Sequence, residues 1–217
     1  PGVFMARIVE TGVDTGYSDG SPFMLDFTDP EARTIDILLG ADFDVTGWNY
    51  QQFGVWATGF GDDASGTVGA ASGGAFTAGT GIPQTGSATF TGVSTGVYAA
   101  PDGAGFITAS NMTAVASFAN RSVNFSTTDT RVAPADTIGN IIGNTRYSFA
   151  ANNGLNLNGT MNYAAGSNNL QGEVTAENGM TGSVYGNFYG PSANEIGGTF
   201  AVDGDQGSYI GGFGGKR

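Results

Sequence analysis

The sequence predicts an all-β protein, in which an up-and-down antiparallel barrel of about eight strands follows a small N-terminal β handle region. Apolar and polar residues alternate with a period of two over many short segments, whereas no segment sustains a helical period. Clusters of Gly, Asn and Asp separate these segments, as they separate strands in hairpins. The 38 glycines suit the tightly coiled strands of a small barrel.

The barrel is predicted over residues 84–217, where alternating segments follow one another most regularly. Residues 155–163 give the clearest case, because Asn and Thr occupy the even positions and mostly apolar residues the odd ones. Similar segments lie at residues 87–93, 112–118, 122–126, 182–188, 197–202 and 208–213. About eight such strands close a small barrel whose interior is filled by side chains.

Turn signals between these segments predict the topology. They occur at residues 120–121, 166–169, 177–179 and 203–207, and most of them contain residues that tolerate a positive φ. Because each turn joins neighbours in sequence, a meander is the simplest arrangement. Bulky residues at inward positions predict a filled interior, which disfavours a carrier with its ligand inside the barrel. These residues are Leu155, Leu157, Met161, Val184 and Phe188.

The region before the barrel differs in composition. Residues 1–60 hold many of the acidic residues and both tryptophans, and we expect them to form a handle-like β region. Residues 23–27 and 34–37 read as the two arms of a hairpin with Pro30 in its turn. Residues 61–83 are rich in Gly, Ala, Ser and Thr, which predicts a flexible connector to the barrel.

Charge and composition exclude several classes of function. The net charge of -12 repels phosphate backbones and anionic lipid head groups, so we expect neither nucleic acid nor a membrane surface as the partner. The absence of cysteine excludes disulfides and zinc-thiolate sites. The absence of histidine removes the usual general base and the usual haem and transition-metal ligand, and no cofactor is predicted.

No catalytic constellation is recognisable in the sequence, and the chain is predicted not to be an enzyme. No serine lies in a nucleophile elbow, and the single lysine, Lys216, follows no phosphate-binding loop. The acidic pairs do not match a calcium-binding loop, so we expect them to be solvated and predict no metal site. These pairs are Asp42 with Asp44, Asp62 with Asp63, and Asp203 with Asp205.

One short segment of the barrel carries special backbone requirements. A strand is expected to end at Tyr189, with Gly190 in the turn, Pro191 opening a single helical turn, and the next strand starting at Gly197. We therefore predict that this segment is a structural corner. Its residues are Phe188, Tyr189, Gly190, Pro191, Glu195, Gly197 and Gly198.

The same corner carries a family resemblance. Residues 186–200 and 213–217 closely resemble the C-terminal barrel of transferrin-binding protein B-like surface proteins, and residues 50–56 and 86–92 resemble the segment that leads into it and its first strand. The resemblance covers the chain from about Tyr50. It implies a handle and barrel whose loops bind host iron carriers, haem or complement regulators at the surface of Gram-negative bacteria. It does not imply which ligand, since one fold serves many functions.

Aromatic residues before the barrel are the candidate ligand contacts. Trp48, Tyr50, Phe53 and Trp56 lie within one short stretch. One interpretation is a plug where the handle packs on the barrel, and the other is an exposed hot spot for a protein partner. Trp48, Tyr50 and Trp56 are the predicted ligand-binding residues.

The resulting hypothesis is an exported, non-catalytic binding module that holds a protein or solute, with iron or haem acquisition as the associated role. We expect it in the extracellular space or on the outer membrane surface. Association with the membrane is expected only through a lipid anchor on a removed upstream segment. The alternative is a structural subunit of a surface assembly, coat or filament, whose partner is another copy of the chain.

Overall fold

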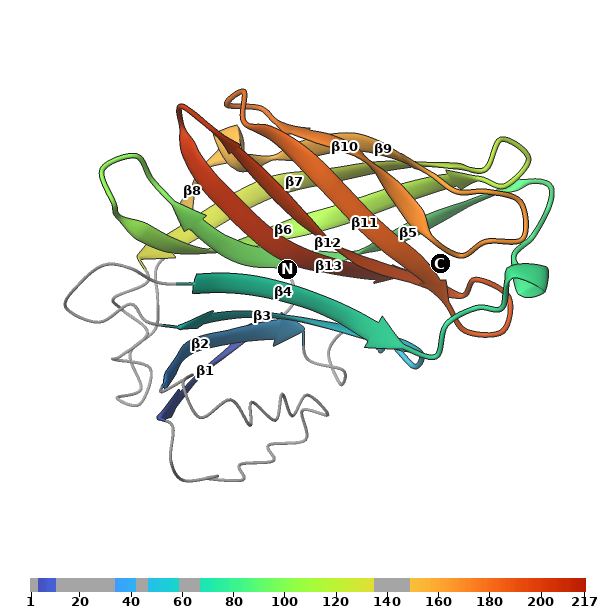
Figure 1. The fold of residues 1–217 in the computed structure, drawn as a ribbon, viewed down its shortest axis with the longest axis horizontal. Coiled ribbons are helices and arrows are strands. Elements are labelled where there is room, and N and C mark those ends of the chain that lie inside the picture. Colours follow the sequence, from blue (N-terminus) through green and yellow to red (C-terminus); the bar gives the residue numbers. More distant parts are fainter. Residues whose placement is uncertain (1–3, 11–33, 42–46, 59–66, 135–148) are drawn as a thin grey trace.

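The computed structural model describes residues 4–10, 34–41, 47–58, 67–134 and 149–217, which form two antiparallel sheets (Figure 1). The smaller is the handle sheet, with strand order β1-β2-β3-β4. Its strands are β1 (Phe4–Glu10), β2 (Thr34–Ala41), β3 (Gln51–Thr58) and β4 (Thr67–Gly74). No helix in the described part of the chain has the length and hydropathy of a membrane span.

The larger sheet closes into the predicted barrel. Its eight long strands are β5 (Ser87–Ala99), β6 (Gly105–Ser117), β7 (Ser122–Pro134), β9 (Leu157–Asn162), β10 (Leu170–Ala176), β11 (Thr181–Tyr189), β12 (Glu195–Gly204) and β13 (Gly207–Lys216). They run in the order β6-β5-β13-β12-β11-β10-β9-β7, and β6 pairs with β7 to complete the ring. The two-residue strand β8 (Ala150–Ala151) pairs with β7 beside it. An all-β, eight-stranded antiparallel meander is thus confirmed.

The N-terminal part agrees in fold class and differs in detail. Residues 23–33 of the expected hairpin lie outside the described residues, and 34–37 belong to β2, which pairs with β1 and β3. Eight residues of the expected connector form β4, and the short 3-10 turn η1 (Gly79–Gly81) follows it. A glycine-rich segment therefore became a strand, because β3 supplies a complete hydrogen-bonding partner along its length.

Side chains fill the barrel interior, as the alternation predicts. All five bulky residues expected to point inward are buried in one continuous apolar cluster. Aromatic rings meet across this cluster, with ring centroids 4.5 Å apart for Phe125 and Phe213 and 4.8 Å apart for Phe200 and Tyr209. Edge-on and tilted aromatic pairs of this kind contribute beyond their buried area. The interior therefore provides the stability of the fold.

Two inward glycines make room for these rings. A Cβ atom at Gly211 would lie 2.5 Å from Cζ of Phe200, and a Cβ atom at Gly198 would lie 2.6 Å from Cζ of Phe213. Both contacts are closer than carbon atoms approach one another. The tip of each large ring therefore lies against a glycine of the neighbouring strand, which lets a narrow barrel hold bulky aromatic residues.

A buried polar group interrupts the apolar interior at Tyr209. Its hydroxyl lies 3.0 Å from Oγ1 of Thr108. Burial raises the pKa of Tyr209 to about 12, and the nearby hydroxyls of Thr108, Ser110 and Ser94 partly offset this rise. Oγ of Ser110 nevertheless has no partner that meets full hydrogen-bond geometry among the described residues. The neutral phenol is therefore the form that the fold requires.

Stability should accordingly fall in alkaline solution. The phenol of Tyr209 titrates from 10.0 in the unfolded chain and about 12 in the fold, so its contribution is complete below pH 10 and is lost as pH rises toward 12. We expect a loss of about 1 kcal/mol at about pH 11 from this group alone. Urea unfolding as a function of pH should show a shallower alkaline decline for Tyr209→Phe. An unchanged decline in that variant would assign the effect to other groups.

Candidate functional site

The handle sheet packs with one face on the outer wall of the barrel, over β5, β12 and β13 (Figure 1). Alternation in β3 buries Gln51, Phe53 and Val55 on the side that faces the barrel. Trp48, just before β3, forms a small apolar cluster with Phe53 and Val93, and the two rings lie 6.0 Å apart. The junction is therefore a second core, smaller than the barrel interior.

Outward-facing glycines give the handle a flat surface to rest on. A Cβ atom at Gly212 would lie 2.5 Å from Cδ2 of Phe53, and one at Gly214 would lie 2.2 Å from Nε2 of Gln51. At Gly197 on β12, a Cβ atom would lie 2.5 Å from Oε1 of Gln51. A side chain at Gly212 would strike the ring of Phe53, whereas one at Gly214 or Gly197 would require the amide of Gln51 to move. We call these three glycines the glycine floor.

The carboxylate of Glu195 fastens the start of β3 to the barrel. Its Oε1 accepts a hydrogen bond from the backbone N–H of Asn49 at 2.7 Å, and its Oε2 accepts from Tyr50 at 2.9 Å and Gln51 at 3.0 Å. The side chain is only 2% exposed. Hydrogen bonds to an ionised acceptor are among the strongest in proteins, so this clamp fixes where the handle begins.

Gln51 is the weak point of the junction. Its side chain is 1% exposed, and neither Nε2 nor Oε1 has a hydrogen-bond partner among the described residues. A buried polar group without a partner costs about 1–3 kcal/mol. The junction thus combines a strong clamp at the backbone with an unsatisfied amide directly beside it.

Replacement of Gln51 by methionine should stabilise the protein. Methionine keeps the length of the side chain, adapts to irregular space and removes the unsatisfied amide, so we expect a gain of about 1–2 kcal/mol. Urea unfolding measures this gain. Gln52→Met is the control, because Gln52 is half-buried on the opposite face of β3. A loss of stability in Gln51→Met would indicate an ordered water that satisfies the amide.

The segment around residues 188–198 connects β11 to β12 through a tight turn. Strand β11 ends at Tyr189, Gly190 adopts a positive φ of 83°, and residues 190–193 form a turn. Strand β12 begins at Glu195, two residues earlier than expected. The two glycines after it serve opposite faces, since Gly197 contacts Gln51 of the handle and Gly198 contacts the ring of Phe213 in the interior.

Hydrogen bonds attach the connector after β4 to this corner. Thr77 donates through its backbone N–H to the carbonyl of Phe188 at 2.9 Å, and through its hydroxyl to the carbonyl of Gly190 at 2.6 Å. Asn168 lies between the two segments, because its Nδ2 donates to the carbonyls of Thr77 and Phe188 at 2.9 and 2.8 Å. From the sequence, Asn168 was predicted only to lie in a turn, because no local pattern indicates hydrogen-bond partners as distant in sequence as Thr77.

The three predicted ligand-binding residues occupy different places. Trp48 is 5% exposed and lies in the junction cluster. Tyr50 is half-buried with its ring over Gly190, and Trp56 is half-buried with its ring over Gly69 of β4. They do not form one patch. Contact with a ligand through any of them stays a prediction.

The structure adds an exposed aromatic residue that the sequence did not single out. Phe76, two residues after β4, is 58% exposed and stacks on Tyr189 with ring centroids 5.1 Å apart. The Tyr189 hydroxyl lies 2.9 Å from Oγ of Ser72, and burial raises the pKa of Tyr189 while this contact partly lowers it. Phe76 thus rests on a rigid base at the edge of the junction.

Acidic clusters that could hold a metal ion do not occur among the described residues. Asp203 and Asp205 lie exposed around the turn between β12 and β13, whereas Asp42, Asp44, Asp62 and Asp63 lie outside the described residues. The described part of the chain thus offers hydrogen-bonding groups and aromatic rings as possible contacts. The Glu195 clamp and the stacked ring of Phe76 both lie at the junction or its edge.

Comparison with known families agrees with this architecture. A family model described as the C-lobe and N-lobe beta barrels of Tf-binding protein B matches residues 82–217. The chain belongs to this family. The matched residues begin just before β5 and include the whole barrel, together with the corner and Glu195. No protein of curated function matches the chain.

Solved structures share the fold at low identity. A transferrin-binding protein B variant from Haemophilus parasuis is 15% identical with a TM-score of 0.53, over 83% of this chain and 35% of that one. Isotype 1 transferrin binding protein B from Neisseria meningitidis is 18% identical with a TM-score of 0.52, over 83% and 33%. An intact transferrin-binding protein B with both lobes is 13% identical with a TM-score of 0.58, over 100% and 38%. This chain therefore spans about a third of these proteins' length, and the likeness shows the fold.

Proposed function

We propose that this chain is a non-catalytic lobe that binds a protein ligand through the handle and the adjacent barrel rim. The observation that carries the proposal is the handle itself, a separate sheet fixed to the barrel wall by the Glu195 clamp and the glycine floor. Such a sheet adds little to a barrel that already closes on itself, but it extends the surface available to a partner. A filled interior also favours a ligand held outside.

The ligand that we propose is a host iron-carrier protein of the transferrin type. This follows the names of the solved relatives, which are transferrin-binding proteins. Residues 1–60 carry nine acidic residues and only two basic ones, so the handle region should favour a cationic face on its partner. We place the protein at the outer surface of a Gram-negative bacterium, where such a partner is accessible.

Phe76 is the contact that we propose at the edge of the junction. It exposes a large apolar surface on a rigid base, which is the arrangement of an aromatic anchor in a protein interface. Tyr50 lies over the same corner, at Gly190, and would extend this contact toward the handle. Trp56 lies on the face of β3 opposite the buried residues Phe53 and Val55, and is proposed as a second contact.

Surface plasmon resonance with immobilised transferrin, iron-loaded and iron-free, tests the proposal. Binding that is about tenfold weaker in Phe76→Ser and unchanged in Val115→Ser would support it, since Val115 is also exposed but lies on β6. Equal binding by both variants would remove Phe76 from the interface. Failure to bind either form, together with a homomeric assembly in light scattering, would overturn the proposal in favour of a structural subunit.

A further inference from the structure

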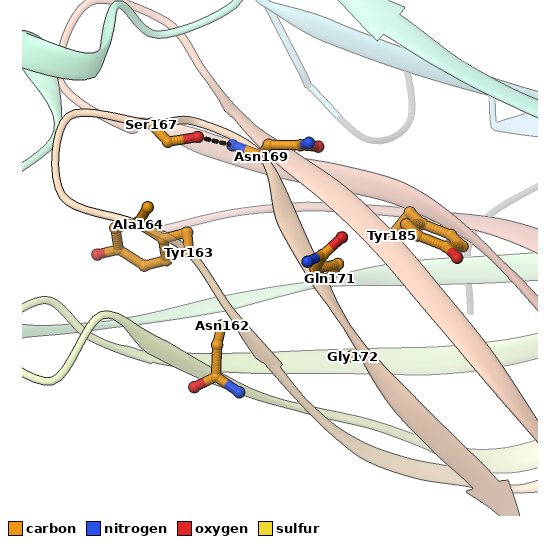
Figure 2. Close-up of a pocket in the computed structure, with 8 residues that line it drawn as sticks. All are labelled: Asn162, Tyr163, Ala164, Ser167, Asn169, Gln171, Gly172 and Tyr185. Carbon is orange, nitrogen blue, oxygen red and sulfur yellow. Dashed lines mark hydrogen bonds between the residues drawn. The ribbon is translucent and has the colours of Figure 1, made fainter.

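A groove on the barrel wall lies away from the handle. It has a volume of about 670 Å³ and is bounded by β9, β10, β11 and the loop between β9 and β10 (Figure 2). Its lining consists of Asn162, Tyr163, Ala164, Ser167, Asn169, Gln171, Gly172 and Tyr185. The handle packs over β5, β12 and β13, whereas the groove lies over β9, β10 and β11.

Strand register places three of these side chains in one row. Gln171 pairs with Asn162 on one side and with Tyr185 on the other. Directly opposed residues in antiparallel strands have Cβ atoms about 5 Å apart. Figure 2 shows Gln171 between the two others on the outer face of the sheet. The groove floor thus presents two amides and one aromatic ring at regular spacing.

The chemistry of the lining selects a neutral, hydroxylated ligand. None of the eight residues is charged, although the chain has a net charge of -12. The side-chain amides of Asn162 and Gln171 have no protein partner among the described residues, and each offers both donors and an acceptor. Tyr185 is 53% exposed, which leaves an open ring face for an apolar surface. Two charged residues lie close to the lining, namely Glu173, two residues from Gln171 on β10, and Arg121, whose charge acts on Tyr163.

The loop that borders the groove is held in place before any ligand arrives. The Ser167 N–H donates to the carbonyl of Ala164 at 3.0 Å, and the Asn169 N–H donates to Oγ of Ser167 at 3.2 Å (Figure 2). Asn168, between them, is tied to Thr77 and Phe188. A loop that is ordered in advance pays less conformational entropy on binding.

Tyr163 lies beneath the groove and belongs to the apolar cluster of the barrel interior. Tyr163 packs its ring edge-on against Phe188, with centroids 5.6 Å apart, and is 8% exposed. Its hydroxyl is buried and has no hydrogen-bond partner among the described residues. Burial raises the pKa of Tyr163, so the group is a neutral donor. Because this hydroxyl is buried, a ligand in the groove would contact other atoms of the lining.

We propose that this groove binds a neutral saccharide, independently of the ligand at the junction. A pyranose ring presents an apolar face of C–H groups and an edge of adjacent hydroxyls. The apolar face would stack on Tyr185, and the amides of Gln171 and Asn162 would each bridge neighbouring hydroxyls. An anionic sugar is disfavoured because no basic residue lines the groove.

The test uses the full chain labelled with nitrogen-15 and titrated with two neutral trisaccharides, maltotriose and chitotriose, to about 10 mM, which saturates even a weak site. We expect shifts of the Asn162 and Gln171 side-chain amides and of the Tyr185 backbone amide. Tyr185→Ala should weaken binding at least about tenfold, whereas Tyr185→Phe should retain it because the ring face remains. A sulfated disaccharide should bind at least about tenfold more weakly than the neutral sugars.

Glu173→Gln provides the matched control, because Glu173 lies on the same face of β10 two residues from Gln171. Its affinity should equal that of the unaltered chain. The proposal is overturned if neither trisaccharide shifts these amides, if the shifts lie on the handle, or if Tyr185→Ala binds as well as the unaltered chain. Stronger binding of the sulfated sugar would overturn it equally. Transferrin binding plays no part in this readout.

Discussion

Replacement of Glu195 by alanine is expected to release the handle from the barrel wall and to lower the free energy of unfolding by about 4 kcal/mol. The carboxylate accepts three backbone hydrogen bonds while 2% exposed, so its removal leaves three donors in the junction without an acceptor. An unsatisfied buried donor costs about 1–3 kcal/mol, and the bonds lost here are charge-assisted. No other side chain within the described residues is seen to accept from these groups.

Urea unfolding followed by tryptophan fluorescence measures this loss. Trp48 reports on the junction, so its emission should shift to longer wavelength before the barrel unfolds if the handle separates first. Glu195→Gln should lose about half as much, because one amide oxygen still accepts while the amide nitrogen faces an N–H. Glu173→Ala is the control on an exposed strand position. Equal stability of Glu195→Ala and Glu173→Ala would show that the clamp contributes nothing.

The barrel was predictable from the sequence because its cause is local. In β9, residues 157–162, the side chains alternate between the interior and water, so the period of two in the sequence is the period of the strand itself. Asn156, which was expected to face water, lies before the strand and is buried, where its Oδ1 accepts hydrogen bonds from Thr130. The turns that follow contain residues suited to positive φ, such as Gly166 and Gly179. Along this half of the chain the local sequence pattern and the overall fold agree, so the architecture can be predicted from the sequence.

The junction was not predictable in the same way because the residues that contact one another there lie far apart in sequence. Glu195 was marked as part of a structural corner, but its acceptor role depends on Asn49, Tyr50 and Gln51, more than 140 residues earlier. Strand β4 was read as a connector because its glycines signal loops. Gly69 is in fact covered by the ring of Trp56 on the neighbouring strand, and a glycine covered in this way is suited to a sheet.

The aromatic stretch before the barrel shows why a sequence leaves two interpretations open. Trp48 and Phe53 pack into the junction, whereas Trp56 lies on the other face of the same sheet. Trp48 and Trp56 are an even number of positions apart, which within one strand would place both side chains on the same face of the sheet. Trp48, however, lies before β3 begins, so the alternation of side chains along the strand does not determine its direction. Residue type alone therefore could not decide which ring faces the barrel.

Replacement of Gly212 by valine, in the glycine floor, is the second change that we expect to destabilise the protein strongly. Valine at this position would place its Cβ atom 2.5 Å from the ring of Phe53, which is packed against Trp48 and cannot swing away. Overpacking of this kind costs about 3 kcal/mol when the surroundings cannot move. We expect the handle to shift off β13, with Trp48 becoming accessible to acrylamide quenching, while the far-UV circular dichroism of the barrel stays the same.

Two further variants separate this mechanism from a general effect of replacing glycine. Gly73→Ala should leave stability unchanged, because no atom lies within 4 Å of a Cβ atom at that position. The double variant Phe53→Ala with Gly212→Val should be more stable than the sum of the two single losses predicts, since Phe53→Ala removes the ring that valine strikes and valine fills part of the space that the ring leaves. Strict additivity of the two stability losses, with Trp48 still protected from acrylamide, would mean that the handle does not rest on Gly212. The Glu195 clamp alone would then have to hold the handle on the barrel wall.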